Sequence, residues 1–331
     1  MAFLLLSAVT ARGQSDADVR AVLDAIVAHA QSSSLYRDRV DWEVVRAGVR
    51  ARAERAATVP QLADALGFLL ESLGDEHGRV LHDGQVVAYH FGGLKPHQAL
   101  FDAGTYGRVQ GGQDFPFAAT LVDGDIGYVR LAGLPMGDNR AMARVIEEAV
   151  CGLADRVAGR WIVDLRYNGG GNLHPMAEGL AQLIGEGPVG GTEGLTPAEC
   201  AMWRVSEGDF LYDDQSIRLE NSCRLASPPR VAVLTSLYTA SSGEALAVVF
   251  KGRADTRFFG GRTLGLTTVT DWLEPGPSTA ATISVGYFRD RGGRVYRDFV
   301  DVDEECPFTE APLGPADECV ARAIAWLRRG G

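Results

Sequence analysis

The sequence predicts an α/β fold in which helices cover both faces of a mostly parallel central sheet. From residue 125 onward, short apolar runs with strand character alternate with stretches of helical periodicity, the pattern of parallel strands joined by helices. The 331 residues are enough for one large core or two modest ones. A hydrophobic content of 46% and a charged content of 23% are those of a globular protein, so the alternation describes a folded core.

A small helical bundle is expected to precede this core, over residues 15–79. Apolar residues recur there at helical spacing, and Asp41 and Thr58 stand where helices begin. Residues 80–124 follow as a segment of loops and short strands. The predicted α/β core then occupies residues 125–331.

Strands and helices are expected to follow one another along this core. Predicted strands are residues 126–131, 161–165, 231–236, 256–259 and 279–285, and predicted helices are residues 141–157, 175–184, 317–327 and a helix that opens with 245–250. An irregular insert, rich in Gly, Asp and Glu, is predicted over residues 185–228.

The composition excludes several partners. A net charge of −11 argues against nucleic acid, because phosphate binding needs clustered Lys and Arg and the basic residues here are spread among acids. No run beyond the N-terminus is long and apolar enough to span a bilayer, so stable membrane insertion is not expected. No motif predicts a cofactor, and the sequence leaves the oligomeric state open.

Residues 1–14 contain an apolar run of signal-peptide length that ends in small residues but lacks the positively charged start of a secretory signal. A signal-peptide remnant and a chance apolar leader both fit this stretch. The first interpretation favours a periplasmic or secreted protein over a cytoplasmic one.

The five cysteines include no C-x-x-C pair, so a structural zinc site is not expected and no metal site is predicted. Two pairs flank loop-like segments and are candidates for disulfides in an oxidising compartment: Cys200 with Cys223, and Cys306 with Cys319. Buried free thiols are the alternative.

The stretch Leu237-Tyr-Thr-Ala-Ser-Ser-Gly-Glu244 links a predicted buried strand to a predicted helix. A serine on such a sharp turn is exposed beside backbone N–H groups, as a covalent nucleophile requires, which makes Ser241 a candidate. The same residues fit the S-x-x-E capping box, in which serine and glutamate satisfy the free donors of a helix start. The turn alone does not decide between catalysis and capping.

A second turn, Arg166-Tyr-Asn-Gly-Gly-Gly-Asn172, follows another predicted buried strand. Consecutive glycines let the backbone approach a ligand with no Cβ in the way, and their N–H groups can converge on one oxygen as an oxyanion hole. The spacing matches neither phosphate-binding glycine motif, and no lysine follows. A flexible glycine turn, braced by an ion pair between Asp164 and Arg166, is the alternative.

A serine nucleophile needs a base, and the candidates are six histidines, two lysines and the carboxylates. His77 stands at the end of a predicted helix between Gly74 and Gly78, where functional residues often gather. His174 lies just past the glycine turn, where it can line the site without being the base. Position alone does not select the base.

Five motifs carry a resemblance to a known family: Leu73-Gly-Asp-x-His77, Ile126-Gly-Tyr-Val129, Asp164-Leu-Arg-x-Asn-x-Gly-Gly171, Thr239-Ala-Ser-Ser-Gly-Glu244 and Gly261-Arg-Thr-Leu-Gly265. In this order, over about residues 40–327, they resemble the carboxyl-terminal processing (tail-specific) peptidases, a family that includes the tricorn core protease and the interphotoreceptor retinoid-binding repeats. The third and fourth motifs form the specific pair. The resemblance implies a ClpP/crotonase-like α/β core.

Carried over by residue, the resemblance implies that Ser241 is the nucleophile. The oxyanion hole is expected from three amides, those of Gly169, Gly170 and Ser242. Substrate contacts are expected from three further residues, Asn168, Gly171 and His174.

The base departs from the better-known branch of the family, in which a lysine closes a G-x-T-x-G-K pattern. Leu266 stands in the place of that lysine. The tricorn-like branch uses a histidine from a short motif before the core, and His77 falls on this motif, so the resemblance implies His77 as general base. Asp303 is the expected third group that orients the imidazole, with Asp75 or Asp301 as alternatives. The segment after His77 is too short for the PDZ domain that many relatives carry.

The predicted function is that of a serine peptidase acting on peptides or proteins. Ser241 would attack the carbonyl, His77 would take its proton, and water would hydrolyse the acyl-enzyme. A non-catalytic ligand- or peptide-binding module is the first alternative, because the missing lysine is what a decayed protease would show. Hydrolysis of small esters or lactams by the same residues is the second.

Overall fold

The computed structural model describes residues 16–219, 223–225 and 227–329. The expected signal-peptide remnant at residues 1–14 lies outside them. Among the described residues, no helix combines the length and the apolar character that crossing a membrane requires. The chain divides into two compact units, drawn from Met1–Gly92 with Thr270–Val285 and from Gly93–Val269 with Gly286–Gly331.

The first unit contains the predicted helical bundle. Its elements are α1 (Asp16–Ser33), η1 (Arg37–Arg39), α2 (Trp42–Ala53), η2 (Val59–Leu62) and α3 (Ala63–Leu73). The Asp41 carboxylate accepts hydrogen bonds from the first N–H groups of α2, and Gly74 ends α3 with φ +68°. Both ends thus follow from residues visible in the sequence.

The strands of the first unit bring together distant parts of the chain. β1 (Arg79–His82) pairs antiparallel with β2 (Gln85–Tyr89) and with the start of β13 (Thr279–Asp290), which also pairs with β12 (Thr268–Gly276). We expected residues 279–285 to form a strand of the α/β core. The structure places them in the first unit, because their backbone partners are those of β1.

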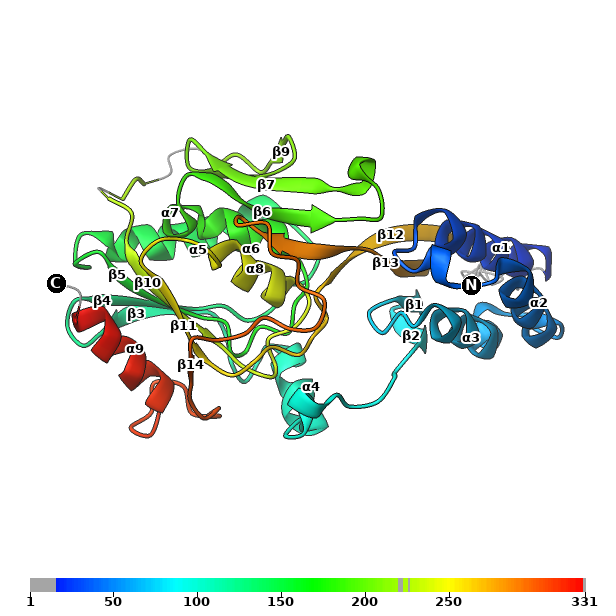
Figure 1. Ribbon diagram of the computed structural model, residues 1–331, viewed down its shortest axis with the longest axis horizontal. Coiled ribbons are helices and arrows are strands. Elements are labelled where there is room, and N and C mark those ends of the chain that lie inside the picture. Colours follow the sequence, from blue (N-terminus) through cyan, green and yellow to red (C-terminus); the bar gives the residue numbers. More distant parts are fainter. Residues whose placement is uncertain (1–15, 220–222, 226, 330–331) are drawn as a thin grey trace, which may run out of the picture. The chain divides into compact units, whose positions relative to one another are not determined.

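A six-stranded sheet forms the centre of the second unit (Figure 1). Its strands, in spatial order, are β14 (Glu304–Glu305), β11 (Thr256–Gly260), β10 (Arg230–Thr235), β5 (Arg160–Asp164), β4 (Ile126–Arg130) and β3 (Ala118–Val122). All neighbours are parallel except β3 and β4, so the predicted mostly parallel sheet is confirmed.

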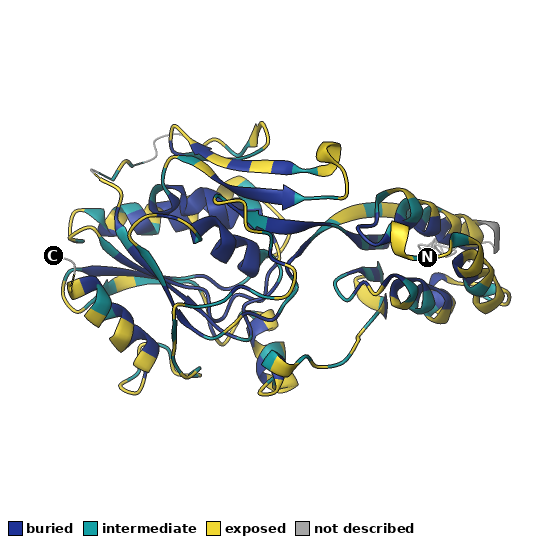
Figure 2. Cartoon of the chain, viewed as in Figure 1, coloured by how far each residue is buried: buried dark blue, intermediate teal, exposed yellow. Residues whose placement is uncertain are grey.

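Helices cover both faces of this sheet, as predicted. α5 (Asn139–Ala154), α6 (Leu173–Gly179) and α8 (Ser242–Phe250) pack on one face and α9 (Glu318–Arg328) packs on the other. In β10, Val231 and Val233 join the core that contains α8, whereas Ala232 and Leu234 join the core that contains α9. A strand that is buried on both faces must be apolar throughout, as β10 is from Val231 to Leu234. The helix α8 is buried as well, as Figure 2 shows.

The insert over residues 185–228 is not irregular, as we expected, but mostly a sheet. It contains β6 (Gly187–Glu193), η4 (Pro197–Glu199), β7 (Ala201–Ser206), β8 (Asp209–Tyr212) and β9 (Gln215–Ser216). These strands pair antiparallel in sequence order, and β6 also pairs with the second part of β13. In β7 the buried Ala201, Trp203 and Val205 alternate with exposed residues, a period of two that the many Gly and acidic residues of the insert obscure.

Three short elements complete the second unit: η3 (Pro96–Gln98), α4 (Ala103–Gly111) and α7 (Ala181–Ile184). The helix α4 falls in a segment predicted as loops and short strands. Asp102 starts it by accepting the Thr105 N–H at 2.7 Å, and Gly112 ends it with φ +68°. Asp102 and Gly112 could have indicated the two ends of this helix in the sequence. The helix was missed because it contains few apolar residues and so shows little helical periodicity.

Two disulfides join Cys151 to Cys223 and Cys306 to Cys319. The predicted Cys306–Cys319 bond is therefore confirmed. The predicted pairing of Cys200 with Cys223 is wrong, and Cys200 is a free thiol. Cys151 lies in α5, 72 residues before Cys223, and no sequence spacing links cysteines so far apart.

Candidate active site

Ser241 stands on the sharp turn between β10 and α8. Its backbone has φ +53° and ψ −121°, in the region of positive φ where a residue with a Cβ is strained. A strained strand-to-helix turn is also the backbone geometry of the nucleophile elbow, in which a serine is exposed at the edge of an α/β sheet. The serine residue is only half-buried.

The Glu244 carboxylate holds the serine turn from inside. One of its oxygens accepts the Ser241 N–H at 2.9 Å, and the other accepts the Gly265 N–H at 2.8 Å and the Thr263 hydroxyl. The first bond is the glutamate half of the capping box, and the Ser241 side chain faces the Glu244 N–H as the serine half, so the capping arrangement is present in this turn. Burial raises the pKa of Glu244 to about 7, although these donors favour the ionised form.

The glycine turn packs directly against the serine turn. The Ala240 N–H donates to the carbonyl of Asn168 at 3.0 Å. A Cβ on Gly170 would lie 2.8 Å from the Cβ of Ser241 and 3.4 Å from its Oγ. Gly170 also has φ +108°, which a residue with a Cβ rarely adopts. Position 170 therefore requires glycine for two reasons, its backbone conformation and its closeness to Ser241.

Two groups next to Ser241, the Gly170 N–H and the Ser242 hydroxyl, already have hydrogen-bond partners. The Gly170 N–H donates to Asn168 Oδ1 at 3.0 Å, so it can serve an oxyanion only by releasing that oxygen. The Ser242 hydroxyl donates to the carbonyl of Gly171 at 2.6 Å, which ties the start of α8 to the glycine turn. The structure therefore brings together Ser241 and five of the residues that the sequence placed around it: Asn168, Gly169, Gly170, Gly171 and Ser242.

Two other predicted site residues of the second unit have partners elsewhere. His174, half-buried at the start of α6, stacks on Tyr212 with ring centroids 5.4 Å apart, and burial lowers its pKa. The Asp303 carboxylate accepts the Phe258 N–H at 2.7 Å, which fastens the chain beside β11. These contacts link His174 to β8 and Asp303 to β11.

His77 belongs to the first unit, in the turn between α3 and β1. The Asp75 carboxylate accepts the N–H groups of His77 and Gly78 at 3.1 and 2.8 Å. The N–H and hydroxyl of Ser284 in β13 donate to the same carboxylate at 2.8 and 2.7 Å. Asp75, one of the candidate third groups, thus fixes the backbone of the turn that carries His77.

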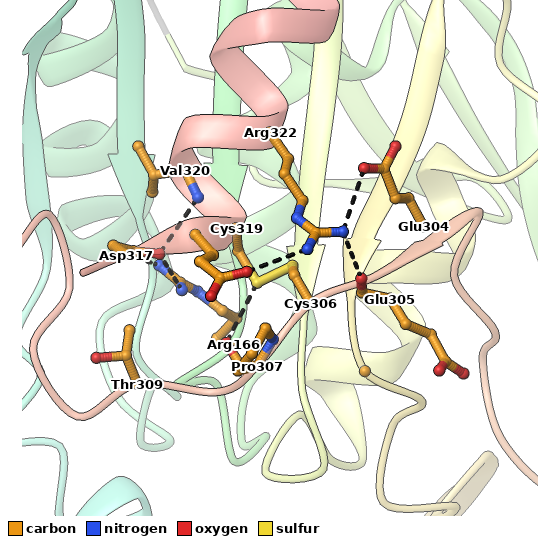
Figure 3. Close-up of a disulfide and its surroundings, with 12 residues drawn as sticks. Arg166, Glu304, Glu305, Cys306, Pro307, Thr309, Asp317, Cys319, Val320 and Arg322 are labelled. Atoms are coloured by element: carbon orange, nitrogen blue, oxygen red, sulfur yellow. Dashed lines mark hydrogen bonds and ion pairs between the residues drawn. A yellow bond between two sulfur atoms is a disulfide. The ribbon is translucent and has the colours of Figure 1, made fainter. Parts of the chain in front are cut away.

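A buried cluster of charges braces the glycine turn, and Figure 3 shows Arg166 and Asp317 of this cluster. The guanidinium of Arg166 makes two hydrogen bonds to Asp164, at 2.9 and 2.7 Å, and two to Asp317, both at 2.8 Å. Burial opposes the ionisation of Asp317, but its bonds to Arg166 keep its pKa below the ordinary value. The carbonyl of Arg166 also accepts the Ser236 hydroxyl at 2.6 Å, so the brace reaches the serine turn.

Sequence reasoning found half of this brace. The Asp164–Arg166 pair is local and was expected. Asp317 lies 151 residues after Arg166. In the sequence it stands only at the start of a helix, and nothing there indicates its pairing with Arg166. The Cys306–Cys319 disulfide, also drawn in Figure 3, joins the first turn of the same helix to the segment that follows β14.

Residues 125–304 match peptidase family S41, a range that contains both the glycine turn and the serine turn. The chain belongs to peptidase family S41. Membership in S41 confirms the resemblance drawn from the five motifs and places the chain among the serine peptidases.

Known proteins resemble the chain in sequence or in fold. The nisin-resistance protein of Lactococcus lactis subsp. lactis is 29% identical over 174 residues, 50% of this chain and 49% of that protein, so the match spans about half the length of this curated relative. A lipoprotein from Streptococcus agalactiae superimposes with a TM-score of 0.67 at 17% identity, over 99% of both chains. The photosystem II D1 C-terminal processing protease superimposes with a TM-score of 0.54 at 18% identity, over 92% of this chain and 96% of that one. At these identities the two structures establish the fold.

Proposed function

We propose that this chain cleaves peptide bonds through an acyl-enzyme on Ser241, which water then hydrolyses. The observation that supports the proposal best is the strained serine turn beside Gly170, whose missing Cβ leaves the space next to the Ser241 oxygen open to a substrate carbonyl. A serine that only caps a helix has extended backbone angles and needs no glycine at its side.

The oxyanion is proposed to lie between the glycine turn and the first residue of α8. The Ser242 N–H belongs to the first turn of α8, where the helix dipole also favours negative charge. Gly169 and Gly170 would supply the remaining donors, Gly170 by giving up its bond to Asn168. Each such donor is worth about 3–4 kcal/mol of the activation barrier. Gly171 and His174 are proposed to contact the substrate.

The proposed general base is His77, on the support of the family motif. Lys251 lies at the opposite end of α8 from Ser241 and donates to the carbonyl of Asp301 at 2.7 Å. Leu266, in the place of the family lysine, accepts no proton. We propose Asp303 as the group that orients His77. Its carboxylate also accepts the Phe258 N–H, so the alternative role for Asp303 is structural.

A fluorophosphonate probe tests nucleophile and base together. We expect the wild-type chain to be labelled at neutral pH, Ser241→Ala to lose labelling, and His77→Ala to slow it by about a hundredfold or more. Ser206→Ala, on the exposed side of β7, is the matched control and should label normally. A folded wild-type chain that resists the probe would refute the peptidase proposal, and normal labelling of His77→Ala would refute the base.

The substrate class is tested by cleavage of a random peptide library alongside small esters and lactams. We expect turnover of peptides, at rates that depend on Ser241. Nisin belongs in the panel, because the Lactococcus lactis relative is named for resistance to it. Hydrolysis confined to the small esters or lactams would favour the small-molecule alternative.

A further inference from the structure

A pocket of about 600 Å³ lies at the carboxyl edge of the parallel sheet in the second unit. It is lined by residues that end or closely follow three neighbouring strands: Arg166 after β5, Thr235–Tyr238 at the end of β10, and Gly260–Arg262 at the end of β11. Open α/β sheets bind ligands at this edge, outside the carboxyl ends of their strands. The volume is that of an ordinary small-ligand site.

The pocket adjoins the serine turn. Tyr238 lines it and precedes Ser241 by three residues. The next carbonyl, that of Thr239, accepts the Leu264 N–H at 2.9 Å. Leu264 in turn offers its own carbonyl 3.2 Å from Nε2 of His97, another lining residue. One set of hydrogen bonds therefore fixes both the pocket wall and the approach to the nucleophile.

The wall is mainly apolar. Leu100, Leu237 and Phe308 line it together with the Cys306–Cys319 disulfide, which Figure 3 shows beside Arg166. The ring of Phe308 packs against Tyr238 with centroids 4.8 Å apart. Leu100 is 88% exposed, so an apolar ligand that covers it removes that side chain from water.

We infer that this pocket receives a large apolar or aromatic side chain of the peptide substrate, close to the bond that Ser241 attacks. The inference rests on the proposed peptidase function and adds a substrate preference to it. A flat, wet surface next to the serine would accept any side chain, whereas an apolar pocket discriminates by the area that it buries.

Gly261 offers a way to fill the pocket while the backbone stays in place. A Cβ there would come no closer than 3.9 Å to any heavy atom outside its neighbours. At Gly260, by contrast, φ is +115° and a Cβ would lie 2.0 Å from the carbonyl of Thr235. Gly261→Leu therefore adds an apolar side chain at the pocket wall. The matched control is Gly107→Leu, on an exposed site of α4 where a Cβ meets nothing within 4 Å.

The test measures binding of labelled peptides to the Ser241→Ala chain by fluorescence anisotropy, with Phe, Leu or Ala at each position in turn. We expect Phe or Leu to bind about tenfold or more tightly than Ala at one position. Adding Gly261→Leu should bring this ratio close to one, and adding Gly107→Leu should leave it unchanged. The chain with Ser241 intact should show the same ratio in kcat/KM.

The outcomes separate this inference from the function on which it rests. A preference that survives Gly261→Leu, or the absence of an apolar preference at every position, overturns the pocket assignment even if the fluorophosphonate labels Ser241. An apolar preference that Gly261→Leu removes, in a chain that the probe does not label, supports the pocket and leaves a peptide-binding protein in place of a peptidase.

Discussion

The missing side chain of Gly170 is what leaves room beside Ser241. We predict that Gly170→Ala lowers labelling and kcat by about a hundredfold or more, because its Cβ would lie 2.8 Å from the Cβ of Ser241 on a backbone with φ +108°. Circular dichroism should show that the chain still folds. Gly152→Ala, in α5, is the control: its Cβ meets nothing within 4 Å, and activity should be unchanged. Wild-type labelling of Gly170→Ala would contradict this reading of the turn.

Glu244 makes stability depend on pH. Burial raises its pKa from 4.5 in the unfolded chain to about 7, so its contribution to stability is fully present below about pH 4.5 and is lost as pH rises through about 7. The loss is about 3 kcal/mol on this shift. We predict that urea unfolding of the wild type shows this decline in unfolding free energy between about pH 4.5 and 7 and that Glu244→Gln, which does not titrate, lacks it. Parallel pH profiles for the two chains would contradict the assignment.

Among single residues, the sequence predicted those whose role depends on their immediate neighbours in the chain. The glycine turn and the serine turn each lie within eight residues, and their chemistry follows from residue types in a row. Thr263 and Gly265, which bind the other oxygen of Glu244, come from a different strand connection and are visible only in the fold. Propensity and spacing carry no record of such contacts.

The last helix contributes to the active-site region through one residue. Asp317 caps α9 and completes the buried pairing of Arg166. We predict that Asp317→Asn lowers the free energy of unfolding by about 3 kcal/mol or more, because it leaves a buried guanidinium short of negative charge. It should also lower kcat, since it loosens the glycine turn that carries the proposed oxyanion donors.

The control for Asp317→Asn lies one residue further along. Glu318 pairs with Arg322 on the surface, where both side chains are largely exposed. Glu318→Gln should change the free energy of unfolding by less than about 1 kcal/mol and leave kcat unchanged. Equal effects of the two substitutions, measured by urea unfolding, would show that the brace has no special role.

Element prediction succeeded where one pattern ran without interruption. The parallel strands β5 and β10 are apolar on both faces, and α5 repeats its apolar residues at helical spacing. The strands of the insert were missed, because Gly187, Gly190 and Gly191 lower the strand propensity of β6. Their pairing with β13 supplies the stability that local sequence lacks.

Across the whole chain, long-range connections escape the sequence and decide how segments are grouped. β1 pairs with β13 about 200 residues later, with Arg79 opposite Thr282, and this pairing draws residues 270–285 away from the predicted core. The wrong partner for Cys223 has the same cause. Local patterns name the elements, whereas the pairing of distant ones depends on the packing of complete surfaces.

The two disulfides allow stability and activity to be separated. A bond that closes a longer loop removes more entropy from the unfolded chain, so Cys151–Cys223, across 72 residues, should contribute about 4 kcal/mol, and Cys306–Cys319, across 13 residues, about 3 kcal/mol. We predict that replacing the first pair with alanine costs more stability in urea. Replacing the second pair should cost more fluorophosphonate labelling, because Cys319 holds the helix turn from which Asp317 reaches Arg166. The link between the Cys306–Cys319 disulfide and the glycine turn would be contradicted if the loss of labelling followed the loss of stability in the same way in both variants.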